Sequence, residues 1–145
     1  MKKVKSTYLL SIFAMILFII MSCSQSSETQ TEVQAYLDNY NKQYQKYAYL
    51  WNEGEWALNT KIVEGDTIIS KNAQDAQAQY AMFTGSKENI EKSTMYLQSK
   101  DELTELQIRQ LKRILYLAAS NPETAGDIVK EKIEADTKQT ELLYG

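Results

Sequence analysis

The chain has 145 residues, with 16 Lys and Arg against 19 Asp and Glu, a formal net charge of −3, no histidine and one cysteine. Ser-His-Asp and Cys-His catalysis, an H-E-x-x-H zinc site and a Cys/His zinc finger all need imidazole, so the composition excludes each of them in this chain. A single cysteine also excludes a disulfide within the chain.

Residues 1–22 have the pattern of a lipoprotein signal peptide. Lys2, Lys3 and Lys5 precede an apolar run from Tyr8 to Met21. The run is about 14 residues long, which is shorter than the ~20 residues that span a bilayer. We therefore expect a secretory signal that is removed from the mature protein.

The end of this signal resembles a bacterial lipobox. The letters IMSC at residues 20–23 place an aliphatic residue at −3, a small residue at −1 and Cys23 at +1. The resemblance implies cleavage before Cys23 and acylation of its thiol, with residues 23–31 forming the lipidated cysteine and a polar tether. We then expect a lipoprotein of the bacterial cell envelope, held by membrane lipid and facing the periplasm or the exterior. The alternatives are an incidental cysteine after an ordinary signal peptide and an uncleaved membrane anchor.

The rest of the chain, residues 32–145, is expected to be helical. Removal of the signal takes away three lysines and no acidic residue, so the mature chain is more acidic and nucleic acid is an unfavourable partner. Few Gly and Pro residues interrupt it, and no alternation of β-branched residues is long enough for a sheet. The sequence predicts an all-α fold with about five helices.

The first predicted helix runs from about Glu32 to Asn59. Seven apolar or aromatic residues follow the spacing of one helix face, namely Val33, Tyr36, Leu37, Tyr40, Tyr44, Tyr47 and Trp51. Such a tyrosine stripe could be a stacking platform for carbohydrate or bases. Packing against neighbouring helices is the favoured interpretation, because a tyrosine ring buries well while its hydroxyl stays at the wet edge. Trp56 is also assigned to packing.

Four further helices follow. Apolar spacing predicts the second from about Thr67 to Phe83, with Gly85 as its stop, and the third from a Ser86 cap to about Ser99. The capping-box pair Thr104 and Gln107 begins the fourth helix. Its apolar face is expected to include the residues Leu106, Ile108, Leu111, Ile114, Leu115 and Ala118. Asn121-Pro122-Glu123 is the expected start of the last helix, with proline at the first helical position and Ile128 on the apolar face.

Chemical motifs are few. Asp127, Glu131 and Glu134 share one helix stripe and could in principle hold a hard cation, but flanking lysines favour a solvated face. The chain has no phosphate-binding glycine loop and no nucleophile elbow. No catalytic or metal-binding residue follows from these patterns.

Several segments together resemble one enzyme family. They are EWALNTKI at residues 55–62, VEGDT at 63–67, FTGS at 83–86, LTELQIRQL at 103–111 and LYLAA at 115–119. In these segments the chain resembles the N-terminal helices of the angiotensin-converting-enzyme-like zinc peptidyl-dipeptidases, in particular their bacterial lipoprotein members. The resemblance extends from about Val33 to Gly145.

The resemblance implies a lid of helices over a deep cleft. Complete members hold zinc through H-E-x-x-H and a later glutamate, and they release dipeptides from peptide C-termini. None of those zinc-site residues exists in this chain. We therefore expect an incomplete segment with no cofactor of its own, inactive alone, which meets peptide substrate only when a catalytic core is present.

Trp51, Glu55 and Asn59 form one stripe of the first predicted helix. The same resemblance implies that they line the cleft, because they match positions of the family's first long helix that border it. The alternative is that Trp51 belongs to the core, with Glu55 and Asn59 solvated at the helix end. At the level of the whole chain, the alternatives to a peptidase lid are a lipid-anchored helical binding module without enzymatic activity and an unrelated structural lipoprotein.

Overall fold

A computed structural model describes residues 27–61 and 67–144 of the chain. The signal peptide and Cys23 lie outside the described residues. Within those residues the secondary structure is entirely helical, which confirms the all-α prediction. The elements are α2 (Glu28–Thr60), α3 (Thr67–Thr84), α4 (Lys87–Gln98), η1 (Lys100–Glu102), α5 (Glu105–Ala119), η2 (Glu123–Ala125) and α6 (Gly126–Tyr144).

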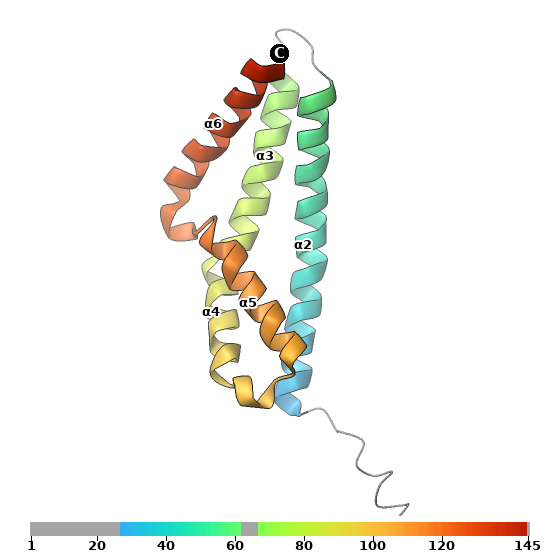
Figure 1. Ribbon diagram of the computed structural model, residues 1–145, viewed down its shortest axis with the longest axis vertical. Helices are drawn as coiled ribbons and strands as arrows, with labels where there is room; N and C mark the ends of the chain where they lie inside the picture. Colours follow the sequence, from blue (N-terminus) through green and yellow to red (C-terminus); the bar gives the residue numbers. More distant parts are fainter. Residues whose placement is uncertain (1–26, 62–66, 145) are drawn as a thin grey trace, which may run out of the picture.

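Helix α2 extends along the whole length of the molecule, and the shorter helices pack beside it (Figure 1). The two halves of the molecule differ in their partners. Helix α3 packs against the second half of α2, while α4 and α5 lie beside its first half. Helix α6 then returns along α3 toward the end of α2. None of the described helices combines the length and hydropathy that a membrane span needs.

The beginning of α2 differs from the sequence prediction by one turn. The helix begins at Glu28, where the Ser27 hydroxyl accepts a hydrogen bond from the backbone N–H of Gln30 at 3.1 Å. Residues 28–31 therefore belong to the helix and not to a polar tether. Gln30 also ties this end to the other half of the fold, because its side chain donates to the carbonyl oxygen of Glu102 at 2.7 Å.

The caps of α4 and α5 are the ones that the sequence predicts. The Ser86 hydroxyl accepts from the N–H of Asn89 at 3.3 Å. At α5 the capping box is complete, since Thr104 Oγ1 accepts from the Gln107 N–H at 3.2 Å and the Gln107 side chain accepts from the Thr104 N–H at 3.1 Å. These bonds satisfy N–H groups that a helix start leaves without a partner.

The start of the last helix differs from the prediction. Pro122 precedes a short 3-10 turn, and α6 begins only at Gly126. The Glu123 carboxylate accepts a hydrogen bond from the N–H of Lys87 at 2.6 Å, so it caps α4 instead of its own helix. The cause is a contact with a distant part of the chain. The Glu123 N–H donates a hydrogen bond to the Gly85 carbonyl oxygen at 3.1 Å, which holds this segment against the start of α4.

The hydrophobic core lies between α2, α4 and α5. It consists of the buried residues Val33, Leu37, Tyr40, Tyr96, Leu103, Leu111 and Ile114. The tyrosine stripe of α2 is part of this packing. Its rings face rings of α3 and α4 with centroids 4.7 to 5.8 Å apart, in the pairs Tyr36–Tyr96, Tyr40–Phe83, Tyr44–Tyr80 and Trp51–Tyr80. The stripe therefore packs between helices and does not form an open stacking platform.

Three residues that we expected to pack are exposed. The exposed fractions are 67% for Trp56, 58% for Leu106 and 68% for Ile128. Each lies five residues from a packed residue of the same helix, and five residues correspond to roughly 140° around the helix axis. They therefore lie on faces that no other described helix covers.

Candidate functional site

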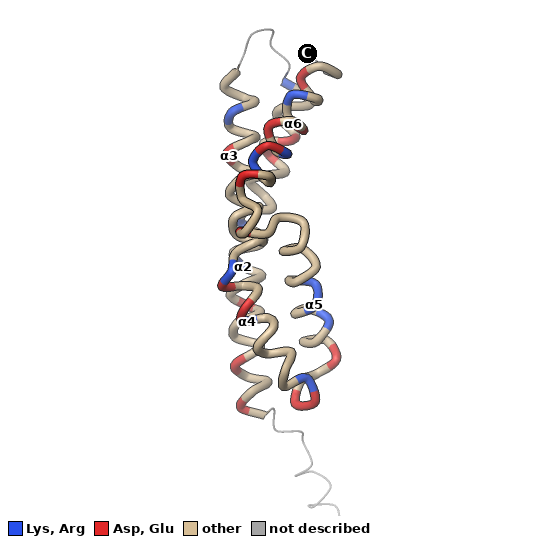
Figure 2. The backbone as a smooth tube through the Cα atoms, turned by 90° about the vertical axis from the view of Figure 1, so that its left-hand side faces the viewer, with Lys and Arg blue, Asp and Glu red and all other residues tan. Residues whose placement is uncertain are grey.

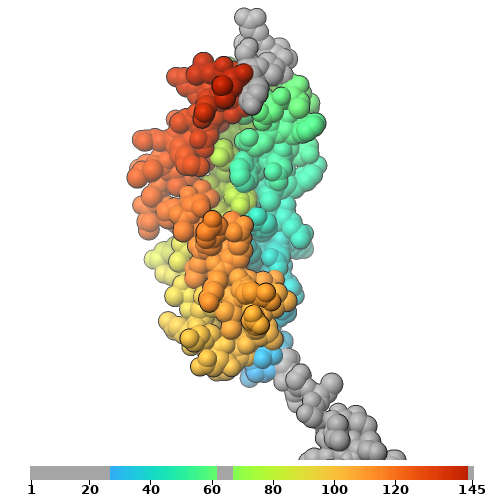
Figure 3. All heavy atoms as spheres, viewed as in Figure 1, coloured from blue at the N-terminus to red at the C-terminus, as the bar shows by residue number. Residues whose placement is uncertain are grey.

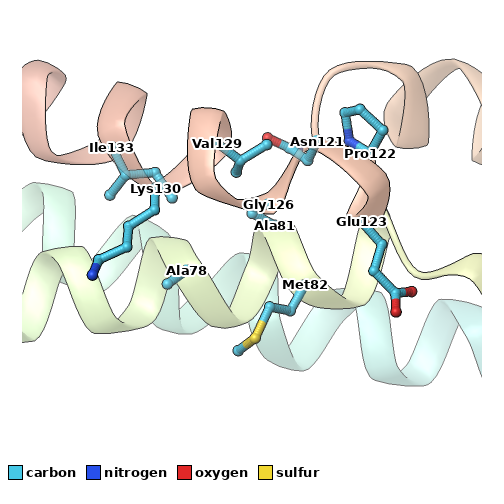
Figure 4. Close-up of a pocket in the computed structure, with 10 residues that line it drawn as sticks. All are labelled: Ala78, Ala81, Met82, Asn121, Pro122, Glu123, Gly126, Val129, Lys130 and Ile133. Atoms are coloured by element: carbon cyan, nitrogen blue, oxygen red, sulfur yellow. The ribbon is translucent and has the colours of Figure 1, made fainter.

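An apolar groove lies between α3 and the first half of α6. It encloses about 500 Å³. Helix α3 contributes Ala78, Ala81 and Met82, while α6 contributes Val129 and Ile133 from the opposite wall (Figure 4). A volume of this size is within the range of small-molecule and side-chain pockets.

The groove lies where α6 begins, beside the second half of α3. Alanine side chains on α3 and a glycine at the start of α6 leave the intervening space unfilled, and a Cβ at Gly126 would have no atom within 4 Å. In the space-filling view α3 is visible between α6 and α2 (Figure 3).

The chemistry of the groove is that of a binding surface. Lys130 and Glu123 are the charged residues that line the groove, and the Glu123 carboxylate already accepts a hydrogen bond from the Lys87 N–H of α4. Among the described residues, no cluster of three or more Cys, Asp or Glu side chains is placed to hold a metal ion. The groove therefore offers apolar contact and one ammonium group, and no nucleophile or general base is oriented into it.

The structure places the predicted stripe Trp51, Glu55 and Asn59 on one side of α2, away from this groove. Trp51 Nε1 donates to Glu55 Oε1 at 3.3 Å, and Asn59 Nδ2 donates to the Glu55 carbonyl oxygen at 2.7 Å. Trp51 also stacks on Tyr80 of α3, with ring centroids 4.7 Å apart. Trp51 is half-buried and serves the α2–α3 contact, while Asn59 is exposed. A role of these residues beside a cleft stays a prediction.

Buried tyrosine hydroxyls dominate the electrostatics of the interior. Burial raises the pKa of Tyr96 to about 12, and the hydrogen bond that its hydroxyl donates to Glu32 at 2.9 Å adds to this. Burial also raises the pKa of Tyr80 to about 12, and it raises the pKa of Tyr40 further. All three hydroxyls stay protonated at neutral pH, which is consistent with a structural role.

Sequence reasoning missed the groove. The available signal was the pair of small residues Ala78 and Ala81 on α3, which would leave a shallow helix face. That signal is weak, because alanine at such spacing is equally typical of closely packed helices. The position of α6, which creates the groove, depends on the contact between Gly85 and Glu123 and not on any local pattern.

Comparison with known proteins identifies no relative that would assign a role to this groove. No protein-family model, no curated protein and no solved structure matches the chain significantly.

Proposed function

We propose that this chain is the N-terminal lid part of a membrane-anchored zinc metallopeptidase of the peptidyl-dipeptidase type, which releases dipeptides from the C-termini of peptides. The chain has no histidine, so it does not itself contain the H-E-x-x-H zinc site of that family. The basis is the resemblance of residues 55–67, 83–86, 103–111 and 115–119 to the first helices of that family.

One structural observation is in line with this proposal. Large apolar side chains are exposed on four different helices, including Trp56 on α2, Met82 on α3, Leu106 on α5 and Ile128 on α6. A catalytic core, the partner that the resemblance implies, would cover some of these side chains.

In this role the helices restrict access to a cleft. Trp51, Glu55 and Asn59 would border the cleft and contact peptide, and zinc would be held by residues of the catalytic core. Acylated Cys23 would hold the protein to membrane lipid. A lid of helices excludes folded proteins and keeps bulk water from the reacting bond, which favours short peptides as substrates.

A second candidate is a lipid-anchored helical binding module without enzymatic activity. It is supported by the core, because Leu37 and Leu111 are 1% and 0% exposed without any further domain. The groove between α3 and α6 would then be the binding surface.

The size of the native product separates the two candidates. An antibody against residues 28–145 would be used on cells that carry the gene. A band several times larger than this chain, with chelator-sensitive release of dipeptides in the immunoprecipitate, is the result expected for a peptidase lid. A band of the size of this chain, with no such activity, would overturn the lid proposal and favour the binding module.

Within the larger protein, Glu55→Gln tests the cleft role. We expect the KM for peptides to rise about tenfold, because a charged hydrogen bond contributes ~1.5–3 kcal/mol. Glu53→Gln is the matched control, since Glu53 is exposed and lies roughly 160° around α2 from Glu55. Equal KM values for the two variants would contradict a cleft role for Glu55.

A further inference from the structure

One side of α5 carries positive charge in a chain that is acidic overall. The chain has only two arginines, Arg109 and Arg113, and both lie on this helix, with Lys112 between them. Glu105 is the one acidic residue of α5. The helix is therefore basic, although the chain as a whole has a formal net charge of −3.

These three cations lie on the side of α5 that faces away from the core. The buried side of the helix consists of Gln107, Leu111, Ile114 and Ala118. At about 100° per residue, Arg109, Lys112 and Arg113 fall on the opposite side, and all three are exposed. Figure 2 shows Lys and Arg along the outer edge of α5. We call these three residues, with the neighbouring Leu106 and Tyr116, the basic face of α5.

No acidic side chain of the described residues neutralises the basic face. The ion pairs in this part of the chain each join a lysine to an acid one turn away on the same helix, and none of them includes Arg109, Lys112 or Arg113. Glu105 lies one turn before Arg109, yet the two form no ion pair in the structure. The face therefore presents its full charge to a binding partner.

Two further features of the face are typical of protein interfaces. The guanidinium of Arg113 lies over the ring of Tyr116, 5.0 Å from its centroid. A guanidinium that stacks on a ring uses its flat side, so the N–H donors at its edge remain for a carboxylate. Tyr116 and Leu106 are themselves 66% and 58% exposed. Arginine and tyrosine are enriched where proteins bind one another, and they contribute much of the binding energy there.

We propose that the basic face of α5 binds an acidic segment of a partner protein, in which two carboxylates lie one helical turn apart. Arg109 and Arg113 are four residues apart, about 6 Å along the helix axis, so each guanidinium binds one carboxylate of such a segment. An apolar side chain of the segment covers Leu106 or Tyr116. The residues of this face all belong to the chain itself, so the proposal does not depend on a peptidase role.

An extended anionic surface, such as a membrane, fits the face less well. Asp101 and Glu102 in η1 and Glu105 in α5 stand at the beginning of the basic face. Glu105 is only about 6 Å along the axis from Arg109. A plane of anionic headgroups would meet these carboxylates within a Debye length of about 10 Å and would be repelled by them. A short segment can contact the two arginines without reaching the acids.

The probe is a helical peptide with two glutamates one turn apart and a leucine on the same side. Its binding to the ¹⁵N-labelled full chain, in uncharged detergent, would be followed by NMR titration. We expect shifts confined to α5 and a dissociation constant about fivefold higher for Arg109→Gln and for Arg113→Gln. Both side chains are exposed, so the Tm of the variants should not change. Arg113→Lys keeps the charge but loses the fork of donors, and it should still weaken binding.

Three controls make the result specific. Lys138→Gln removes one exposed positive charge from α6 and should leave the dissociation constant unchanged. A peptide with glutamine in place of both glutamates should not bind. Phosphatidylglycerol vesicles should not shift the α5 signals. The proposal would be overturned by absence of α5 shifts with the acidic peptide, by an equal loss of affinity in Lys138→Gln, by equal binding of the glutamine peptide, or by vesicle binding that depends on Arg109 and Arg113. A dimer that dissociates in Arg113→Gln would also overturn it, since a second copy would then occupy the face.

Discussion

Gly85 lies closer to another backbone segment than any larger residue could. A Cβ at this position would be 1.5 Å from the carbonyl oxygen of Asn121. Helix α3 ends at Thr84, so Gly85 follows the helix end as predicted, but its φ lies outside the left-handed region. Glycine is therefore needed here for space, so that the segment before α6 can pack on the turn between α3 and α4.

Gly85→Ala is expected to lower the free energy of unfolding by about 3 kcal/mol, because backbone atoms must move to admit the methyl group. Urea unfolding followed by circular dichroism measures this. Gly126→Ala is the matched control, since open space surrounds that position, and it is expected to be neutral or stabilising by up to ~1 kcal/mol. Similar values for both variants would contradict the steric argument.

Tyr96 couples stability to alkaline pH. Burial raises its pKa in the folded protein to about 12, whereas an unfolded tyrosine ionises near pH 10. The unfolded chain therefore loses the proton first, so the contribution of Tyr96 is fully present below pH 10 and is lost as pH rises toward 12. Tyr96→Phe should make the fall in unfolding free energy between pH 10 and 12 less steep. Tyr49→Phe, at a side chain that is 63% exposed, should leave the slope unchanged, and equal slopes for the two variants would refute the assignment.

At the scale of elements, local chemistry predicts where α4 and α5 begin. The Ser86 cap and the Thr104–Gln107 capping box are contacts within four residues, so sequence spacing determines them. The register of the tyrosine stripe is predictable for the same reason. The exposure of Trp56 and Ile128 is not predictable in this way, because it depends on which neighbouring helix covers a given face.

Glu123 is the clearest case of a contact that sequence spacing does not reveal. Its carboxylate caps α4, which begins 36 residues earlier in the chain. Glu123→Ala should lower the free energy of unfolding by about 1 kcal/mol, the usual value for loss of a cap. Hydrogen exchange should also accelerate at the Lys87 amide. Glu131→Ala, at an exposed side chain on α6, is the control and should change neither quantity. An unchanged Lys87 exchange rate in Glu123→Ala would contradict the capping role.

For the whole molecule, the sequence predicts the helical class and the packing role of the tyrosines, but not the groove. The groove requires the angle between α3 and α6, which depends on contacts between residues far apart in the chain. The proposed peptidase role rests on the resemblance of residues 55–67, 83–86, 103–111 and 115–119, and the size of the native product tests it.

The membrane anchor is tested by Cys23→Ala in the full chain. We expect the variant to leave the membrane fraction and to lose labelling by a fatty-acid analogue, because no other thiol is present. The membrane fraction and the label would be followed in the same cells. Continued acyl labelling of Cys23→Ala would remove the lipobox assignment.

The length of α2 has a consequence for how an anchored molecule would stand on a bilayer. A helix of 33 residues is about 50 Å long, and the four residues from Cys23 to Ser27 span at most ~14 Å. The end nearest the lipid would carry the acidic groups at the start of α2 and in η1, such as Glu28 and Glu102 (Figure 2). Anionic headgroups repel carboxylates within a Debye length of about 10 Å. The last turns of α6 lie at the opposite end of the molecule (Figure 1), so they would be the part of an anchored molecule that extends farthest from its lipid.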